Sequence, residues 1–126
     1  MVKFTIERQP ITKKNSQRIV TVHGRPMIIP SKQYKQYEKD CMAFMPRIDT
    51  IDYPINIKAT FYMKTKRRVD LVNLEQALND ILVHYGVIED DNNTILVSMD
   101  GSRVSYDKER SRTEVEITRI EGEENG

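Results

Sequence analysis

Two groups of acidic side chains flank one predicted helix, and they are the residues of this chain best suited to chemistry. Asp70 stands at the start of the helix, which spans about residues 70–85, and Glu89-Asp90-Asp91 follows its end. Hard divalent cations such as Mg²⁺ bind convergent carboxylate oxygens and keep several water ligands. One or two such ions can activate a water molecule and stabilise a leaving phosphate oxygen. These acids therefore predict a metal-dependent site, provided that the fold brings them together.

The same helix is predicted to carry a polar stripe beside its apolar face. At 100° per residue, a side chain next to the core-facing surface is half-shielded from water and points into the cleft beside it. The stripe consists of Asp70, Asn73, Ala77, Asp80 and His84. A loop that folds back along the helix would bring Asp91 near the middle of this stripe. Asp70 also has a simpler interpretation as the N-cap, because carboxylates are favoured at the positive end of a helix.

The near-neutral total charge hides a division between the two halves of the chain. Residues 1–68 carry 15 Lys and Arg and 5 Asp and Glu, a net of +10, whereas residues 69–126 carry 5 and 14, a net of −9. A basic half can lie along a polyanion, and an acidic half can hold divalent cations. The competing interpretation is that the two halves neutralise each other across the folded surface.

Hydrophobic periodicity predicts a small α+β fold. Alternation of apolar and polar residues predicts strands at 2–6, 55–63 and 113–118. A third long strand is predicted to begin at Ile95, with a bulge or turn at Asp100-Gly101. Residues 18–29 are predicted to form a hairpin, with Gly24 supplying a positive φ in the turn. Ser31 is predicted to cap a first helix that Pro46 ends, and Gly86 to end the second. The expected architecture is a single α+β domain, a mixed sheet with two main helices, in the order β-(hairpin)-α-β-α-β-β.

Composition and motifs exclude several classes of protein. A chain of 126 residues suits one domain, and its short apolar runs predict no membrane span. The single cysteine, Cys41, is predicted to be a buried, inert thiol, and His23 and His84 lack the spacing of a zinc site. No phosphate-binding glycine loop is present, so no nucleotide cofactor is expected. We expect a cytoplasmic protein.

The residues around the second helix resemble a known family. Lys64 to Arg68 form a basic segment, followed by Asp70, Leu71, Asn73, Leu74 and Asp80, then by Gly86 and the Asp90-Asp91 pair. This pattern resembles the RusA family of Holliday junction resolvases, endonucleases found mainly in phages and prophages. The resemblance assigns residues 1–120 to a RusA-like endonuclease domain and leaves residues 121–126 as an acidic tail, predicted to be disordered. It implies Mg²⁺-dependent cleavage of four-way DNA junctions by a homodimer in recombination and repair, with Mn²⁺ as an alternative cofactor.

Matched residue by residue, Asp70 and Asp91 fall on the family's metal-binding catalytic aspartates, and Asn73 falls on its motif asparagine. Two positions depart from the family pattern, because Val72 replaces a catalytic aspartate and Gln76 replaces a lysine. The site is then either rebuilt with a neighbouring acid or inactive. Asp80 and Asp90 are the best substitutes, with Asp90 also a candidate metal ligand. Glu75 is a weaker choice, because it projects roughly 140° away from Asp70 around an ideal helix.

The predicted DNA contacts lie in two basic loops and at the start of the second helix. Lysine and arginine side chains there would contact phosphates, which position DNA without reading its sequence. The candidate DNA-binding residues are Lys13, Lys14, Asn15, Arg18, Lys66, Arg67, Arg68 and Asn73. The leading hypothesis is a hydrolase that resolves four-way or otherwise branched DNA. The alternatives are a catalytically weak or inactive junction-binding dimer, and a small dimeric α+β interaction module that binds no nucleic acid.

Overall fold

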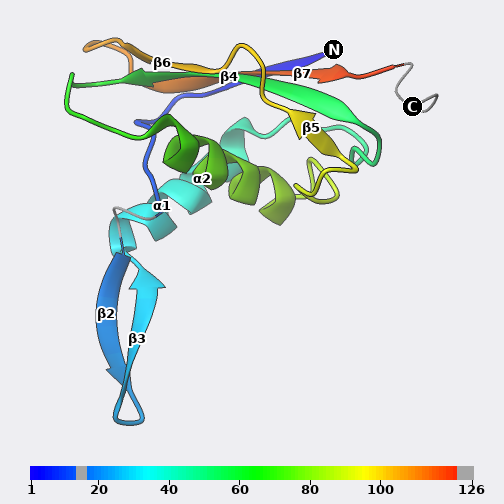
Figure 1. The fold of residues 1–126 in the computed structure, drawn as a ribbon. Helices are drawn as coiled ribbons and strands as arrows, with labels where there is room; N and C mark the ends of the chain where they lie inside the picture. Colours follow the sequence, from blue (N-terminus) through cyan, green and yellow to red (C-terminus); the bar gives the residue numbers. More distant parts are fainter. Residues whose placement is uncertain (14–16, 122–126) are drawn as a thin grey trace.

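Five strands form one mixed sheet, and two helices cover one of its faces (Figure 1). The computed structural model of the chain describes residues 1–13 and 17–121. The central strand β4, Ile55–Met63, pairs antiparallel with β7, Arg112–Arg119, which pairs antiparallel with the edge strand β1, Val2–Ile6. On its other side β4 runs parallel to two short strands, β5 (Leu96–Ser98) and β6 (Arg103–Tyr106). The predicted α+β class and single mixed sheet are confirmed.

The core lies between the sheet and the helices, as the alternation in β4 requires. Ile55, Ile57 and Ala59 are fully buried, while the intervening Lys58 is exposed on the opposite face. One residue in two therefore faces the helices, which is the period of a half-covered strand. Within the described residues, no helix is long and apolar enough to cross a membrane.

The two helices begin and end close to where the sequence predicts. Helix α1, Lys32–Cys41, starts at Ser31, whose hydroxyl accepts a hydrogen bond of 3.2 Å from the backbone N–H of Tyr34. A short 3₁₀ helix, η2, Met42–Phe44, continues α1 and stops before Pro46. Helix α2, Leu71–His84, is followed by Gly86, whose φ of 71° confirms its role in ending the helix. Cys41 is fully buried, as predicted, and burial raises the pKa of its thiol to about 12.

The strand predicted from Ile95 is shorter than expected, because the chain forms β5 and β6 with a break between them at Asp100-Gly101, where the sequence predicts a bulge or turn. At this break, side chains make hydrogen bonds in place of the backbone pairing found along the strands. The Asn56 carboxamide oxygen accepts from the Ser98 hydroxyl at 2.6 Å and from the Asp100 backbone N–H at 2.7 Å. The Ser102 hydroxyl accepts from the Ala59 backbone N–H at 3.0 Å. These contacts let the chain bulge around Gly101 and rejoin β4 in parallel.

The predicted hairpin is confirmed, and it stands apart from the rest of the fold. Strands β2 (Gln17–Val22) and β3 (Arg25–Pro30) form a separate two-stranded sheet that projects from the start of α1 (Figure 1). Its two-residue turn has φ of 51° at His23 and 76° at Gly24. Positive φ at both central residues is the geometry that suits the twist of a hairpin. We call the β2–β3 hairpin the arm.

Candidate active site and nucleic-acid interface

Asp70 occupies the N-cap position of α2 by its backbone, but its carboxylate is not used as the cap. The carbonyl oxygen of Asp70 accepts from the Leu74 backbone N–H at 3.2 Å, and no side-chain capping bond is formed. Its Oδ2 accepts instead from Asn73 Nδ2 at 3.2 Å. The side chain is exposed. Asn73 therefore orients an accessible carboxylate, which is an arrangement that leaves oxygen lone pairs for another ligand.

Val72 and Gln76, the two departures from the family pattern, both lie on the exposed side of α2. Val72 is 72% exposed although it is apolar, so packing does not explain its presence. Gln76 Nε2 donates to Asp80 Oδ1 at 3.0 Å. A lysine at position 76 would bring a cation to Asp80. In this chain the cation comes from elsewhere.

That cation is Lys13, whose ammonium lies 3.8 Å from Asp80 Oδ2 and 5.9 Å from the ring centroid of Tyr34. The pair joins the segment that precedes the arm to the middle of α2. Asp80 is thus held on both carboxylate oxygens, by Gln76 on one and by Lys13 on the other. The sequence identified both residues but gave no sign that they meet.

The acidic group after α2 is organised around Asp90. Its Oδ1 accepts from the Asp91 backbone N–H at 2.7 Å, and its Oδ2 accepts from Asn92 Nδ2 at 3.1 Å. Asp91 is half-buried, and its carboxylate forms no hydrogen bond or ion pair with any described residue. Of the pair Asp90 and Asp91, it is therefore Asp91 whose carboxylate oxygens are open to a ligand.

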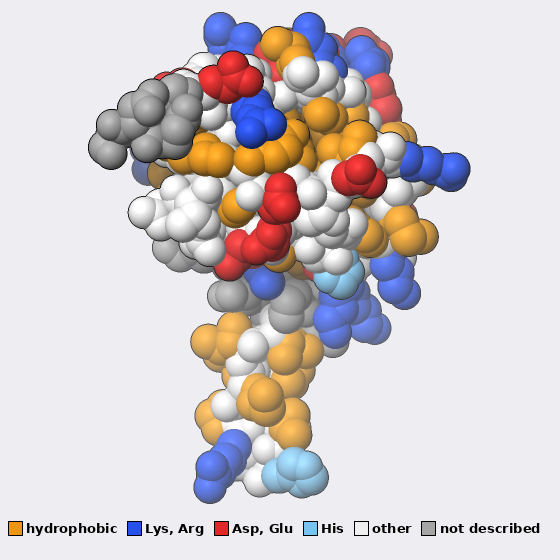
Figure 2. Space-filling view, turned by 90° about the vertical axis from the view of Figure 1, so that its right-hand side faces the viewer, with side chains coloured by type: hydrophobic (Ala, Val, Ile, Leu, Met, Phe, Trp, Pro, Cys, Tyr) orange, Lys and Arg blue, Asp and Glu red, His pale blue; other side chains and the backbone are white. Residues whose placement is uncertain are grey.

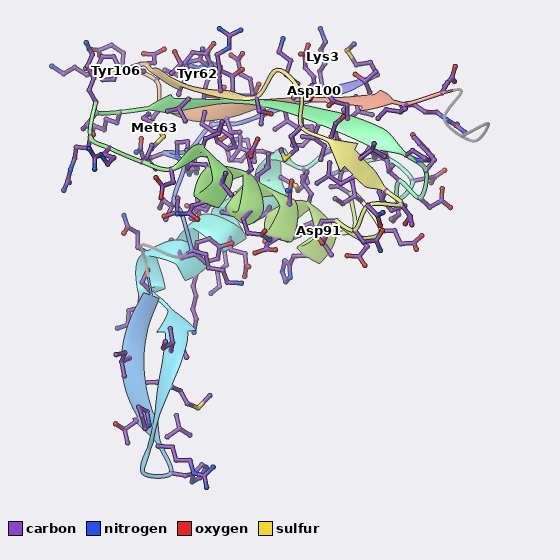
Figure 3. The ribbon with its side chains drawn as sticks, viewed as in Figure 1. Lys3, Tyr62, Met63, Asp91, Asp100 and Tyr106 are labelled. Carbon is purple, nitrogen blue, oxygen red and sulfur yellow. The ribbon has the colours of Figure 1, made fainter. Side chains whose placement is uncertain are left out.

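The loop does not fold back along α2, in contrast to the expectation. The Ile51 backbone N–H donates to Val87 O at 3.0 Å, and the Glu89 N–H donates to Ile51 O at 2.9 Å. These bonds tie the loop to the segment that enters β4, and Figure 3 shows Asp91 beside the C-terminal end of α2. Asp70 lies at the other end of this helix of 14 residues, which is about 21 Å long.

One copy of the chain consequently does not assemble a complete metal site from described residues. Across residues 1–13 and 17–121, no group of three or more acidic, histidine or cysteine side chains lies close enough to hold an ion. Glu75 and His84 do not complete such a group of metal ligands. Partial burial raises the pKa of the Glu75 carboxyl, and His84 packs edge-on against Tyr85 with ring centroids 4.7 Å apart.

The basic segment before α2 is fully exposed and borders a cavity. Residues 64–68 are all exposed, and the Lys66 ammonium lies 5.1 Å from the ring centroid of Tyr106. Beside them is a cavity of about 310 Å³. It is lined by Gln9, Met63, Lys64, Thr65, Arg67, Arg68 and Val69. The sequence missed Gln9 and Tyr106, since each reaches this segment only through the fold.

Arg67 and Arg68 are two exposed cations of this segment. Their guanidinium groups make no ion pair with a described residue, which leaves them available for phosphate. Of the other predicted DNA contacts, Lys14 and Asn15 lie outside the described residues, as does the side chain of Arg18. The exposed basic segment of residues 64–68 ends two residues before the exposed Asp70.

Comparison with known families gives one match. The family model described as Endodeoxyribonuclease RusA matches residues 7–118. The match includes β4, the basic segment, all of α2 and the acidic loop after it. No curated protein matches the chain.

Proposed function

Because this chain belongs to the RusA endodeoxyribonuclease family, we propose that it is a divalent-cation-dependent endonuclease that resolves four-way DNA junctions in recombination and repair. The observation that carries this proposal is the continuity between the exposed cations of residues 64–68 and the carboxylate of Asp70. Cations that hold phosphates next to acids that bind a metal are what phosphodiester hydrolysis requires. We assign residues 1–120 to the nuclease domain and place its action in the cytoplasm.

The donor set suits a hard cation. We propose Asp70 and Asp91 as the principal carboxylates, with Asp90 as the additional metal ligand, and Mg²⁺ as the cofactor with Mn²⁺ as an alternative. The bound ion would supply an activated water molecule and stabilisation of the leaving oxygen. Asn73 orients the Asp70 carboxylate through its 3.2 Å hydrogen bond. Asp80 acts on Lys13, which it holds beside the helix.

We propose that a two-fold homodimer completes this site. Asp70 and Asp91 lie at opposite ends of α2, so one chain cannot bring both to one ion without rearranging. In an isologous dimer, residue i of one copy meets residue j of the other, and the reverse contact is made at the same time. Two antiparallel copies of α2 would place Asp70 of one protomer near Asp91 of the other.

The two-fold symmetry of the proposed dimer also matches the symmetry of the proposed substrate. A four-way junction has near two-fold symmetry, and its resolution needs cuts on two opposing strands, so two identical sites match it. We propose that Lys13, Lys14, Asn15, Arg18, Lys66, Arg67, Arg68 and Asn73 position the DNA through its phosphates.

The experiment that tests the function compares a four-way junction with a linear duplex of the same arm sequence, with Mg²⁺ and with EDTA. We expect paired nicks in the junction only when Mg²⁺ is present, and none in the duplex. The Asp70→Asn protein serves as the control, and it should bind the junction without cutting it. Equal cutting of duplex and junction would contradict structure selectivity.

A second candidate is a junction-binding dimer with weak or no cleavage. Val72 favours it, because an apolar side chain stands where the family has a catalytic aspartate. A gel shift specific for the junction, together with no nicking in Mg²⁺ or Mn²⁺, would establish this alternative.

A further inference from the structure

The arm is an exposed β-ribbon that the rest of the described fold does not cover. Among the described elements, β2 and β3 make extensive contacts only with each other. Residues 21–28 are all exposed. Six residues in each strand give a ribbon about 20 Å long. An isolated two-stranded hairpin is marginally stable in water, so a ribbon of this kind gains its stability from what it contacts.

Both faces of the arm are apolar. The cross-strand pair Ile19 and Ile28 lies on one face, and the pair Val20 and Met27 lies on the other. Ile19 is 73% exposed, Ile28 66% and Met27 48%. Figure 2 shows hydrophobic side chains along the length of the arm and charged or histidine side chains at its tip. Exposed apolar surface of this extent, concentrated on a projecting element, marks a binding surface.

The charge around the arm indicates what kind of molecule binds it. From Arg8 to Tyr37 the sequence contains seven Lys and Arg and no Asp or Glu. Such a segment favours a polyanion and repels its own two-fold copy. The arm also begins beside the candidate site, because Lys13 in the segment before it is paired with Asp80 on α2.

We propose that the arm is a wedge whose aliphatic side chains pack against exposed base faces at the branch point of the DNA. This inference rests on the proposed function, since it assumes a branched DNA substrate. A ribbon that read base edges in a groove would need hydrogen-bonding side chains, and Ile19, Ile28 and Met27 have none to offer. Aliphatic side chains instead insert between base steps and replace base stacking. A branch point is where stacking is most easily interrupted, so the arm supplies selectivity for structure.

The test uses the cross-strand pair. The Ile19→Ser/Ile28→Ser variant removes the apolar side chains of one face and changes no charge. Its Kd is measured for a four-way junction and for a linear duplex, at several salt concentrations. The matched control is Ile48→Ser, which makes the same chemical change at a side chain that is 40% exposed outside the arm. A junction with 2-aminopurine at the branch point reports unstacking by its fluorescence.

We expect the double variant to lose about tenfold or more in junction affinity and less than about twofold in duplex affinity. The salt dependence should stay unchanged, and the fluorescence increase produced by the unmodified protein should be lost. A second variant, in which Gly-Gly replaces residues 18–29, does not depend on the hairpin fold. Because it also removes Arg18 and Arg25, it is judged by its ratio of junction to duplex affinity. It should also lose junction selectivity.

Several outcomes would overturn the wedge. Unchanged junction affinity in both variants, or equal losses on junction and duplex, would show that the arm does not recognise branch points. A change from dimer to monomer in sedimentation velocity would show that the apolar faces bind a second copy of the chain. In each of these cases the unmodified protein still binds and cuts junctions, so the proposed function stands. If the unmodified protein does not prefer junctions, the proposed function and the wedge fall together.

Discussion

The ammonium of Lys13 lies 3.8 Å from the carboxylate of Asp80, so the segment that precedes the arm is anchored to the middle of α2. Both side chains are partly exposed, and an isolated pair of this kind contributes little to stability. The ion pair matters because of where it holds the two side chains. It fixes a cation beside the helix and occupies an acid that the sequence offers as a substitute for the missing aspartate at position 72.

This contact separates the two candidate substitutes. Asp90 accepts hydrogen bonds only from neutral donors, the Asp91 backbone N–H and Asn92, whereas the charge of Asp80 is paired with the Lys13 ammonium. If Asp90 completes the metal site, Asp90→Asn should lower the rate of junction cleavage by about a hundredfold or more, because a metal ligand loses its charge. Asp80→Asn should lower it by less than about tenfold. Single-turnover cleavage at saturating Mg²⁺ measures both rates, and the opposite ranking would assign the catalytic role to Asp80.

The exposed guanidinium groups of Arg67 and Arg68 should account for part of the salt dependence of DNA binding. Each phosphate contact contributes about 0.9 to the slope of log K against log salt. The Arg67→Ala/Arg68→Ala variant should therefore bind more weakly and have a slope shallower by about 2. Fluorescence anisotropy over a range of salt concentrations measures this slope. Arg47→Ala/Lys108→Ala removes the same charge elsewhere and should leave the slope nearly unchanged. Equal slopes for the two variants would exclude the basic segment from the interface.

The local elements of this fold could be predicted because their signals are local. The alternation from Ile55 to Met63 gives the bounds of β4, and Ser31 and Gly86 mark helix ends by their own side-chain or backbone chemistry. Asp100-Gly101 marks the position of the break in the edge strand, but the way in which this break is held could not be predicted from local signals. It depends on Asn56 and Ser102 accepting or donating hydrogen bonds across more than 40 positions of sequence.

The candidate site likewise combines a contact that follows from local sequence with a position that does not. Asp70 and Asn73 are three residues apart on one helix, so their contact follows from helical geometry. The position of Asp91 does not, because the hydrogen bonds that Ile51 exchanges with Val87 and Glu89 decide where the acidic loop lies. The sequence predicted that the two acids would converge within one chain. The structure places them at opposite ends of α2, and we propose that a second copy of the chain brings them together.

The ion pair between Glu7 and Arg110 predicts a specific pH dependence of stability. Hydrogen bonding to the Arg110 guanidinium lowers the pKa of Glu7 below its ordinary value of 4.5, so the carboxylate stabilises the fold above that value. This contribution is lost as the pH falls through the lower, folded pKa. Urea denaturation of Glu7→Gln should show a loss below about 1 kcal/mol at pH 7, because both partners are partly exposed.

The difference from the unmodified protein should shrink towards zero below pH 4. Glu109→Gln is the control, since the Glu109 carboxylate forms no ion pair with a described residue. A loss for Glu7→Gln that persists unchanged at low pH would show that the stabilisation does not come from the charged pair.

Restoring the family's acid at position 72 tests whether the site is depleted. Val72 is 72% exposed in the first turn of α2, so aspartate fits there and its charge suits the helix N-terminus. Val72→Asp should keep or slightly raise thermal stability. If the site lacks a ligand, the variant should cleave junctions faster, above all at limiting Mg²⁺. Val72→Asn is the control, because asparagine has nearly the same shape as aspartate and carries no charge. Equal rates for the three proteins would indicate that Asp90 already fills the role.

Mixing two inactive variants tests whether the site is shared between protomers. Asp70→Asn and Asp91→Asn should each abolish cleavage while leaving junction binding level or slightly stronger, because repulsion of phosphate falls. In a shared site, Asp70 of one protomer acts with Asp91 of the other. A heterodimer of the two variants then contains one site with both asparagines and one site with both aspartates.

An equimolar mixture should thus regain cleavage, with about a quarter of the sites of the unmodified protein if subunits exchange at random. The product should be single nicks in place of paired cuts, because only one site of each heterodimer is intact. Gel analysis of a junction labelled on both cleavable strands distinguishes these products. The doubly substituted Asp70→Asn/Asp91→Asn chain, mixed with either single variant, is the control and should restore nothing. If both aspartates act within one chain, every dimer in the first mixture has two defective sites, and no cleavage should return despite confirmed exchange of subunits.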